Sequence, residues 1–201
     1  MNPQYLSEGG RSRSATPFRP FVCATVLAAA VAGAPNAAAP VAAQEPAGPP
    51  ASQHGTVSQT VNRTIISAGY DRPVARGRVL FGDSGLVAND ALWTPGANRA
   101  TWVEFSTNVE INGNAVPAGR YSLWSIPRNG PWSLLLNKTW DTHHAIYPGD
   151  VDDVLRIEVS PERGEHMEAL ALYFPVVGPY ETELRIHWGT VVVPLRITVP
   201  E

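Results

Sequence analysis

The sequence is poor in cysteine: Cys23 is the single one among 201 residues, and it lies in an N-terminal stretch that we expect to be removed. The remaining chain then has no thiol with which to form a disulfide. Its stability has to come from the burial of apolar side chains, and a folded region of about 145 residues buries roughly two thirds of its surface. The sequence therefore predicts one domain with one hydrophobic core.

Long hydrophobic runs are also missing. The longest, "FVCATVLAAAVAGA" at 21–34, has about 14 residues, whereas about 20 are needed to cross a bilayer. It follows the basic segment "RSRSATPFRP" and precedes "PVAAQ", in which Val41 and Ala43 occupy the positions that a signal peptidase reads. This pattern is typical of a secretory signal peptide.

The predicted organisation follows from that cleavage site. We expect a signal peptide over 1–43, a flexible Pro/Ala/Gly-rich leader over 44–54 and a single domain over 55–201. The protein is expected to be exported, either to a periplasm or outside the cell. No membrane insertion is expected after cleavage.

Charged residues make up only 16% of the chain. Removal of 1–43 leaves 12 basic and 17 acidic side chains, which gives a net charge of −5. An acidic balance argues against a nucleic acid or an anionic membrane as partner. We also expect no cofactor.

The chain has no alternation of strand and helix patterns and no internal repeat. It has short β-branched or aromatic runs separated by turn residues, such as "TVSQTV", "TWVEFS" and "WSLLLN". We predict an antiparallel β-sandwich or flattened barrel of about 8–11 short strands. At most one short helix is expected, and "SPERGEHMEALAL" at 160–172 is the segment that fits one.

Two hairpins are predicted from turn residues. Asn112 and Gly113 stand between apolar runs and both accept a positive φ. Near the C-terminus, 181–188 and 191–199 alternate with period two, and the break at Gly189 predicts a second tight hairpin. Pro194 cannot donate a backbone hydrogen bond, so we expect the last strand to lie at a sheet edge.

Ser84, in "FGDSG", raises the possibility of a serine hydrolase. The order Ser84, Asn98, His144 is that of the SGNH esterases, with Asp141 three residues before the histidine. However, Ser84 and Asn98 are only 14 residues apart, and "GLVANDALWTPGAN" has no helical period to build an oxyanion hole. A polar turn is the alternative interpretation of this serine.

Several motifs in order carry a family resemblance. "HGTVSQTV", "YDRPVARGRVLFG", "LWTPGANRATWVEFSTNVEINGNAVPAGRYSLWSIP", "WSLLLN" and "DVLRIEV" together resemble the bacterial secreted family known as domain of unknown function 2911. The resemblance runs from about His54 to the C-terminus. It implies a compact, mostly β, exported domain and supplies no catalytic residue. Where family members typically read "FGGLVPYGKVW", this chain reads "FGDSGLVANDALW", so Ser84 falls in the part that departs from the pattern.

One group of polar and aromatic residues is a candidate ligand site. Arginine binds oxyanions with two parallel hydrogen bonds, and tryptophan stacks on sugar faces. In the alternative interpretation the arginines pair with nearby carboxylates, the amide satisfies loop backbone and the indole is core. The candidates are Tyr70, Arg72, Arg78, Trp93, Asn98 and Thr101.

A second group, in "TWDTHHAIYPGDVDD", is a weak candidate for a metal site. Asp141, His143 and His144 are ligands of the kind that zinc binds, but no HExxH frame is present. Adjacent histidines are expected to point to opposite sides of an extended segment. A solvated polar loop is the alternative. Trp124 and Trp132, which flank a predicted turn, are candidates for an exposed saccharide platform.

These observations favour an exported binding or accessory module for a small or saccharide-like ligand. The alternative is an enzyme, either a metal-assisted hydrolase or a serine hydrolase that uses Ser84. A structural envelope protein without a ligand is a third possibility. The oligomeric state does not follow from the sequence.

Overall fold

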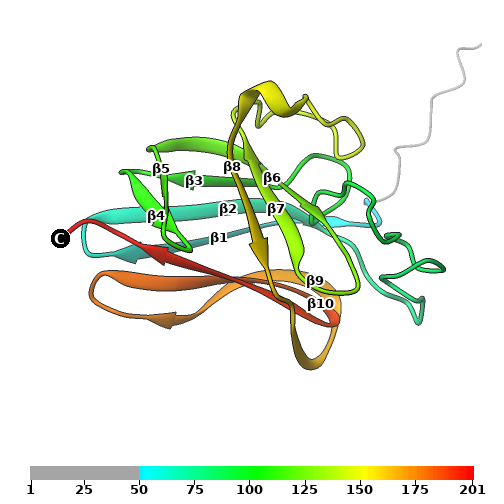
Figure 1. The fold of residues 1–201 in the computed structure, drawn as a ribbon. Coiled ribbons are helices and arrows are strands. Elements are labelled where there is room, and N and C mark those ends of the chain that lie inside the picture. The colour runs from blue at the N-terminus through cyan, green and yellow to red at the C-terminus, as the bar shows by residue number, and fades with distance from the viewer. Residues whose placement is uncertain (1–49) are drawn as a thin grey trace, which may run out of the picture. The chain divides into compact units, whose positions relative to one another are not determined.

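The computed structural model describes residues 50–201, and within them it consists of two antiparallel sheets (Figure 1). The larger sheet has the spatial order β1-β2-β3-β6-β7-β8. Its strands are β1 (Gln53–Val61), β2 (Thr64–Arg72), β3 (Trp102–Phe105), β6 (Gly119–Ile126), β7 (Trp132–Asn137) and β8 (Asp153–Val159). The smaller sheet has the order β5-β4-β10-β9, with β4 (Val109–Ile111), β5 (Asn114–Val116), β9 (Glu162–Val177) and β10 (Glu181–Thr198). The predicted antiparallel β-sandwich is confirmed, and no closed barrel forms in this part of the chain.

The predicted signal peptide and most of the predicted leader lie outside the described residues. β1 begins at Gln53, so Gln53 and His54, which we assigned to the leader, belong to the first strand. No helix in 50–201 is long and apolar enough to cross a membrane.

The core lies between the inner faces of the two sheets. It combines Ile66, Phe105 and Leu134 from the larger sheet with Leu184 and Ile197 from the smaller one, each at most 2% exposed. Alternation along each strand sends these side chains inward and their neighbours outward. An aromatic group closes one end of this core, formed by Phe81, Trp93, Trp132 and Trp188 with ring centroids 5.0 to 6.1 Å apart.

Helical structure in the described residues is limited to the 3-10 turn η1 (Asp150–Asp152). The segment 160–172, which fitted a helix, lies almost entirely in strand β9. Gly164 removes helix propensity there, and the following "ALALYF" alternates with the period of a strand.

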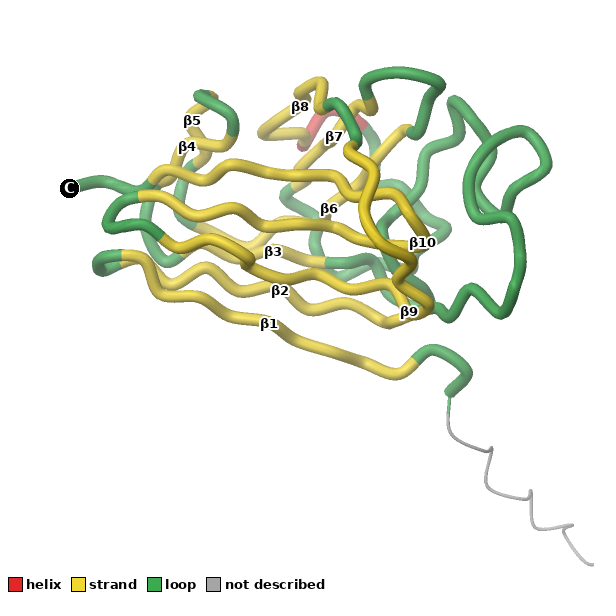
Figure 2. The backbone as a smooth tube through the Cα atoms, turned by 90° about the horizontal axis from the view of Figure 1, so that it is seen from below, coloured by secondary structure: helices red, strands yellow, loops and turns green. Residues whose placement is uncertain are grey.

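The two hairpin predictions had different outcomes. β4 and β5 form the predicted hairpin, with Asn112 at φ 48° and Gly113 at φ 79°. The predicted hairpin at Gly189 is wrong, because β10 continues through it as one strand of 18 residues (Figure 2). Gly189 takes φ +59°, and the register with β9 shifts on both sides of it. Its positive φ makes a β-bulge instead of a turn.

Pro194 does not lie on an edge strand, since β10 has β9 on one side and β4 on the other. The pairing with β9 ends at Val192 and the pairing with β4 begins at Ile197. Pro194 falls between these two stretches, so its missing N–H interrupts neither ladder.

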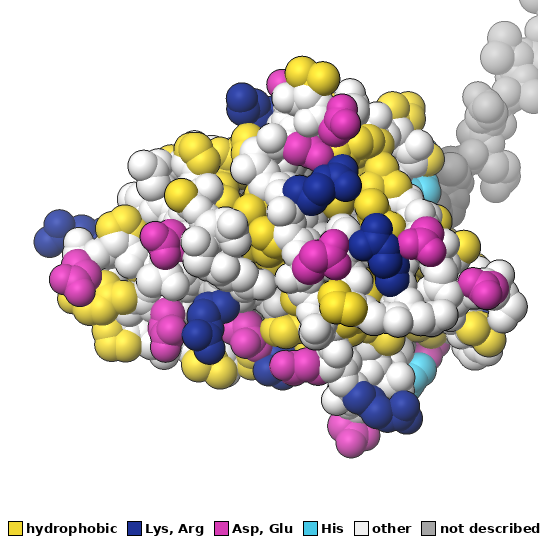
Figure 3. Space-filling model, in the orientation of Figure 1, with side chains coloured by type: hydrophobic (Ala, Val, Ile, Leu, Met, Phe, Trp, Pro, Cys, Tyr) yellow, Lys and Arg dark blue, Asp and Glu magenta, His cyan; other side chains and the backbone are white. Residues whose placement is uncertain are grey.

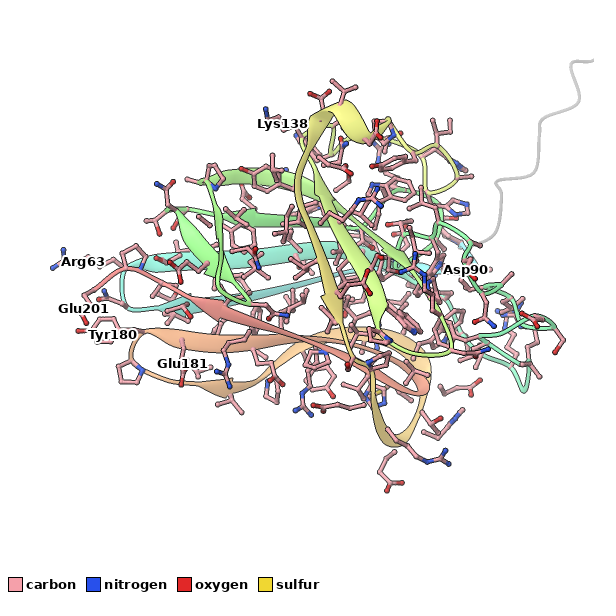
Figure 4. All side chains as sticks on the ribbon, viewed as in Figure 1. Arg63, Asp90, Lys138, Tyr180, Glu181 and Glu201 are labelled. Carbon is pink, nitrogen blue, oxygen red and sulfur yellow. The ribbon has the colours of Figure 1, made fainter. Side chains whose placement is uncertain are left out.

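The outer face of the larger sheet carries a second, smaller core. Trp124 and Leu135 are at most 1% exposed, and Tyr147 packs its ring edge-on against Trp124 at 5.3 Å. Tyr147 belongs to residues 138–149, which we name the site loop; it links β7 to η1 and starts at Lys138, labelled in Figure 4. The site loop therefore covers part of the outer sheet face.

The β1–β2 turn, the β9–β10 turn and the C-terminus lie together, as the labels Arg63, Tyr180 and Glu201 show (Figure 4). Asn62 Nδ2 donates to the carbonyl of Pro200 at 3.1 Å, and Val199 N donates to that of Tyr180 at 2.8 Å. These bonds tie the last residues of the chain to the rest of the fold.

Acidic and basic side chains alternate on the face shown in Figure 3. Arg128 lies close to Asp90 and Glu158 at 2.9 and 3.3 Å, and Arg185 pairs with Glu183 at 2.5 Å. Ion pairs at a protein surface contribute little to stability, but here they balance positive and negative charge across this face.

Candidate functional site

A cavity of about 320 Å³ lies on the outer face of the larger sheet, near the start of β1 and the end of β2. It combines aromatic, acidic and basic side chains, so apolar and polar groups converge on one concavity. The residues that matter for its chemistry are His54, Asp71, Arg99, Trp102, Trp140 and Asp141.

The hairpin between β1 and β2 places His54 beside Asp71. A two-residue connection at Asn62 and Arg63 fixes the register, so that His54 lies directly across from Asp71. His54 Nδ1 lies 3.0 Å from Asp71 Oδ1, and the Asp71 side chain is only 10% exposed. A buried carboxylate requires such a partner, because an unpaired charge is costly away from water.

A layered stack forms the aromatic side of the cavity. The indole of Trp102 lies directly on Gly69, its partner across β2 and β3, where any β-carbon would overlap the ring. The guanidinium of Arg120 lies 4.3 Å from the centre of the Trp102 ring and 4.7 Å from that of Trp140. Arg120 also binds Glu104, its cross-strand neighbour, at 2.7 Å. Cation–π attraction on both faces of Arg120 therefore joins Trp140, in the site loop, to the sheet.

Buried hydrogen bonds anchor the site loop. Asn137 is fully buried, and its Nδ2 donates to the Gly149 carbonyl at 2.8 Å and to Asp153 Oδ1 at 3.0 Å. Its Oδ1 accepts from Thr139 N at 2.9 Å. Burial, followed by the hydrogen bond to Asp153, raises the pKa of Tyr147 to about 12, so this hydroxyl stays protonated and keeps donating to the carboxylate.

Each charged side chain that lines the cavity has an ionic or hydrogen-bonded partner within it. Arg99 forms an ion pair with Asp141, and both side chains are more than half exposed. His54 and Asp71 form the second pair. The cavity thus offers donors and acceptors without a large net charge.

The predicted ligand residues Tyr70 and Arg72 connect the two sheets. The Tyr70 hydroxyl donates to the Leu172 carbonyl at 3.3 Å, and Arg72 Nε donates to the Leu170 carbonyl at 3.1 Å. Tyr70 is 6% exposed and contributes to the wall of the cavity, whereas Arg72 does not line it. Both interactions hold β2 against β9.

Arg78 and Trp93 lie elsewhere. Arg78 donates to the carbonyls of Ala75 and Val74 at 2.9 and 2.6 Å, and it lines a different cleft of about 280 Å³. Trp93 stacks on Trp188, with the ring planes 18° apart. Arg78 therefore stabilises the turn at 75–78, and Trp93 is part of the core.

Asn98 and Thr101 form hydrogen bonds with backbone groups in and around the loop before β3. Asn98 has φ 57°, its Nδ2 donates to the Ser52 carbonyl at 3.4 Å, and its carbonyl accepts from His144 N at 3.2 Å. Thr101 is fully buried, and its hydroxyl donates to the Pro95 carbonyl at 2.7 Å. Of the six predicted ligand residues, Tyr70 is the one that lines the cavity described above, although its side chain packs in the core between the sheets.

The predicted metal residues are close in space but are not arranged as a ligand set. The rings of His143 and His144 are 4.4 Å apart, so the expectation that they point to opposite sides is wrong; they sit in a turn, not in an extended segment. Asp141 is engaged with Arg99. Within 50–201, no group of three or more His, Cys, Asp or Glu side chains is placed to hold a metal ion. Burial lowers the pKa of His144, and His143 lowers it further, while Asp71 raises it.

Ser84 lies in a solvent-exposed turn closed by a bond from Gly85 N to the Gly82 carbonyl at 2.8 Å. In the described residues it makes no hydrogen bond to a histidine. The turn joins no strand to a helix, so the strand-to-helix corner on which an SGNH esterase carries its serine is missing there.

Trp124 and Trp132 are 1% and 4% exposed, so the prediction that they form an exposed platform is wrong. Trp124 is buried because the site loop covers it, and its Nε1 donates to Ser122 Oγ at 2.9 Å. The partly exposed indoles in this region are Trp102 and Trp140.

A family model described as "Protein of unknown function (DUF2911)" matches residues 52–197. The chain belongs to this DUF2911 family. The predicted resemblance is thereby confirmed, and the match spans all ten strands except Thr198. No curated protein and no solved structure matches the chain.

Because the DUF2911 family is described as of unknown function, the role of the cavity residues has to be argued from their chemistry. Sequence reasoning missed His54, because we assigned it to the leader, and it missed Arg99. The position of His54 could have been predicted from the sequence, because a two-residue turn at Asn62 and Arg63 places His54 opposite Asp71. No comparable signal links Trp140 to the sheet, since that contact depends on how the site loop folds.

Proposed function

We propose that this DUF2911 protein is an exported module that binds a small or saccharide-like ligand in the cavity between β2 and the site loop. The observation that carries the proposal is the convergence of two indoles, two carboxylates and a guanidinium on one cavity. Signal-peptide export, which we infer from 1–43, would put this cavity in contact with envelope or extracellular saccharides.

The chemistry of the cavity suits a neutral, hydroxyl-rich ligand. The apolar face of a sugar ring packs on indole, as Trp140 and Trp102 permit. Sugar hydroxyls both donate and accept, and Asp141 supplies acceptors while Arg99 supplies donors. Because Arg99 and Asp141 compensate each other and Asp71 is hydrogen-bonded to His54, the site favours a polar, uncharged ligand over a free ion.

Replacement of Trp140 by alanine should lower retention of the protein on a saccharide ligand at least about tenfold, because it removes a stacking surface. Retention would be measured by affinity electrophoresis and pull-down on xylan, cellulose, chitin and peptidoglycan. Trp140 is 37% exposed, so the variant should keep its fold, which thermal unfolding would verify.

Tyr180→Ala is the matched control, since Tyr180 is an aromatic residue 45% exposed at the β9–β10 turn. It should leave retention unchanged. Equal losses for Trp140→Ala and Tyr180→Ala, or no retention of the unmodified protein on any of the four polymers, would count against the proposal.

A further inference from the structure

The pair of His54 and Asp71 has a defined proton arrangement. A carboxylate can only accept, so His54 Nδ1 must carry the proton that it shares with Asp71 Oδ1 across 3.0 Å. In the neutral ring, Nε2 then keeps its lone pair. Within 50–201, Nε2 of His54 has no hydrogen-bond partner, and the His54 side chain is 61% exposed.

Asp71 is fixed by its place in β2 and by burial. Its side chain is 10% exposed, and its Oδ2 faces the backbone N of Arg99 at 3.5 Å, the outer limit of a hydrogen bond. The fixed acid therefore orients the imidazole, as the third group of a hydrolytic triad orients its base. Both side chains line the cavity that also contains Arg99.

We propose that His54 is a general base for ester hydrolysis in this cavity, with Asp71 as its positioning residue. The inference rests on the proposed function for its substrate class, an O-acylated saccharide-like ligand. It adds a reaction to what is otherwise a binding site, and it needs neither a metal ion nor a serine nucleophile.

The reaction balances with water as the only co-reactant. A water oxygen attacks the ester carbonyl carbon while one of its protons passes to His54 Nε2, and the carbonyl electron pair moves onto oxygen. Arg99, the cation that lines the cavity, is assigned the developing negative charge. The electron pair on the former carbonyl oxygen then re-forms the C=O bond, the bond from carbon to the alcohol oxygen breaks, and the leaving oxygen takes the proton back from Nε2. The products are a carboxylic acid, which ionises, and a free hydroxyl on the ligand.

Hydrolysis of 4-nitrophenyl acetate by the purified protein tests this assignment. The rate should exceed that of an equal concentration of imidazole, and His54→Gln should lower the excess about tenfold or more, because general-base catalysis contributes at least about a hundredfold. His166 is the matched control: it is 59% exposed and lies 2.9 Å from a carboxylate, Glu168, outside the cavity. His166→Gln and Ser84→Ala should leave the rate unchanged.

The positioning role of Asp71 has its own readout. Asp71→Ala should lower kcat with little change in KM, and added formate should restore part of the rate in this variant but not in His54→Gln. Formate can take the place of the missing carboxylate, whereas it cannot replace a base. A loss in Asp71→Ala that formate does not restore, in a variant that unfolds at the normal temperature, would contradict the positioning role.

The outcomes separate this inference from the proposed function. Polysaccharide retention that depends on Trp140, combined with no rate above imidazole or with equal effects of His54→Gln and His166→Gln, overturns the catalytic assignment alone. Ester hydrolysis that depends on His54 without any retention overturns the binding proposal and leaves the base in place.

Discussion

Asn137→Ala is expected to destabilise the domain by about 3 kcal/mol, because it leaves buried hydrogen-bond partners unsatisfied. The side chain is fully buried and joins the end of β7 to Thr139, Gly149 and Asp153. An alanine forms none of these hydrogen bonds, and solvent water does not reach the fully buried site to replace them. The site loop should consequently lose its fixed conformation.

Two measurements check this expectation. Denaturant unfolding gives the change in free energy, and hydrogen exchange should show faster opening of 138–149 than of the paired strands. Asn129→Ala is the control, since Asn129 is exposed in the β6–β7 turn and should change stability by less than about 0.5 kcal/mol. If Asn137→Ala unfolds like the unmodified protein and 138–149 stays protected, the site loop is held by other contacts.

Gly69→Val is expected to cost about 3 kcal/mol and to disrupt the aromatic side of the cavity. A β-carbon at 69 would overlap the indole of Trp102, so that ring has to move. It cannot move outward freely, because Arg120 lies against it and is bound to Glu104. Valine normally favours a strand position, so a loss of stability here would identify the close approach of Trp102 as its cause.

Ser67→Val provides the matched control for Gly69→Val. Ser67 lies two residues earlier on the same face of β2, where its hydroxyl shares an exposed hydrogen bond with Ser58. This variant should be neutral or slightly more stable, because valine suits a half-exposed strand. Thermal unfolding and near-ultraviolet circular dichroism of the tryptophans would compare the two. Equal behaviour of both valine variants would mean that Trp102 has room to move.

Much of the fold follows from local patterns. Period-two alternation and turn residues predict the strands, and the Asn112–Gly113 turn predicts β4 and β5 correctly. The same reasoning fails at Gly189, because a glycine with positive φ serves a β-bulge as well as a turn. The choice between a bulge and a turn depends on the pairing of β10 with β9, which is a long-range interaction.

The candidate site is predictable only in part. The register of the β1–β2 hairpin is local, so the position of His54 beside Asp71 could have been predicted had β1 been extended back to Gln53. The contact of Trp102 with Gly69 depends on the pairing of β2 with β3, which are separated by the loop 73–101. The position of Trp140 depends on Asn137 and Arg120 together. Residue type alone, as with Arg78 or Trp93, did not indicate which side chains share a cavity.

The two halves of the cavity have different origins. The pair of His54 and Asp71 belongs to regular strands, whereas Trp140, Asp141 and Arg99, the ion-pair partner of Asp141, belong to loops. A rigid strand suits a side chain, such as His54, whose imidazole has to keep a fixed orientation, and loops suit side chains that adapt to a ligand. This division is consistent with a binding wall that combines the loops with Trp102 of β3, and a fixed base on β1.

The central claim is that a saccharide-like ligand occupies the cavity beside Trp102 and Trp140. The most direct measurement is a titration of 15N-labelled protein with soluble oligosaccharides, in which each tryptophan indole N–H gives a separate signal. We predict that the signals of Trp102 and Trp140 shift with ligand concentration, while those of the buried Trp124 and Trp132 stay in place. Shifts confined to Trp132 or Trp188, or no shift with any oligosaccharide, would contradict the account.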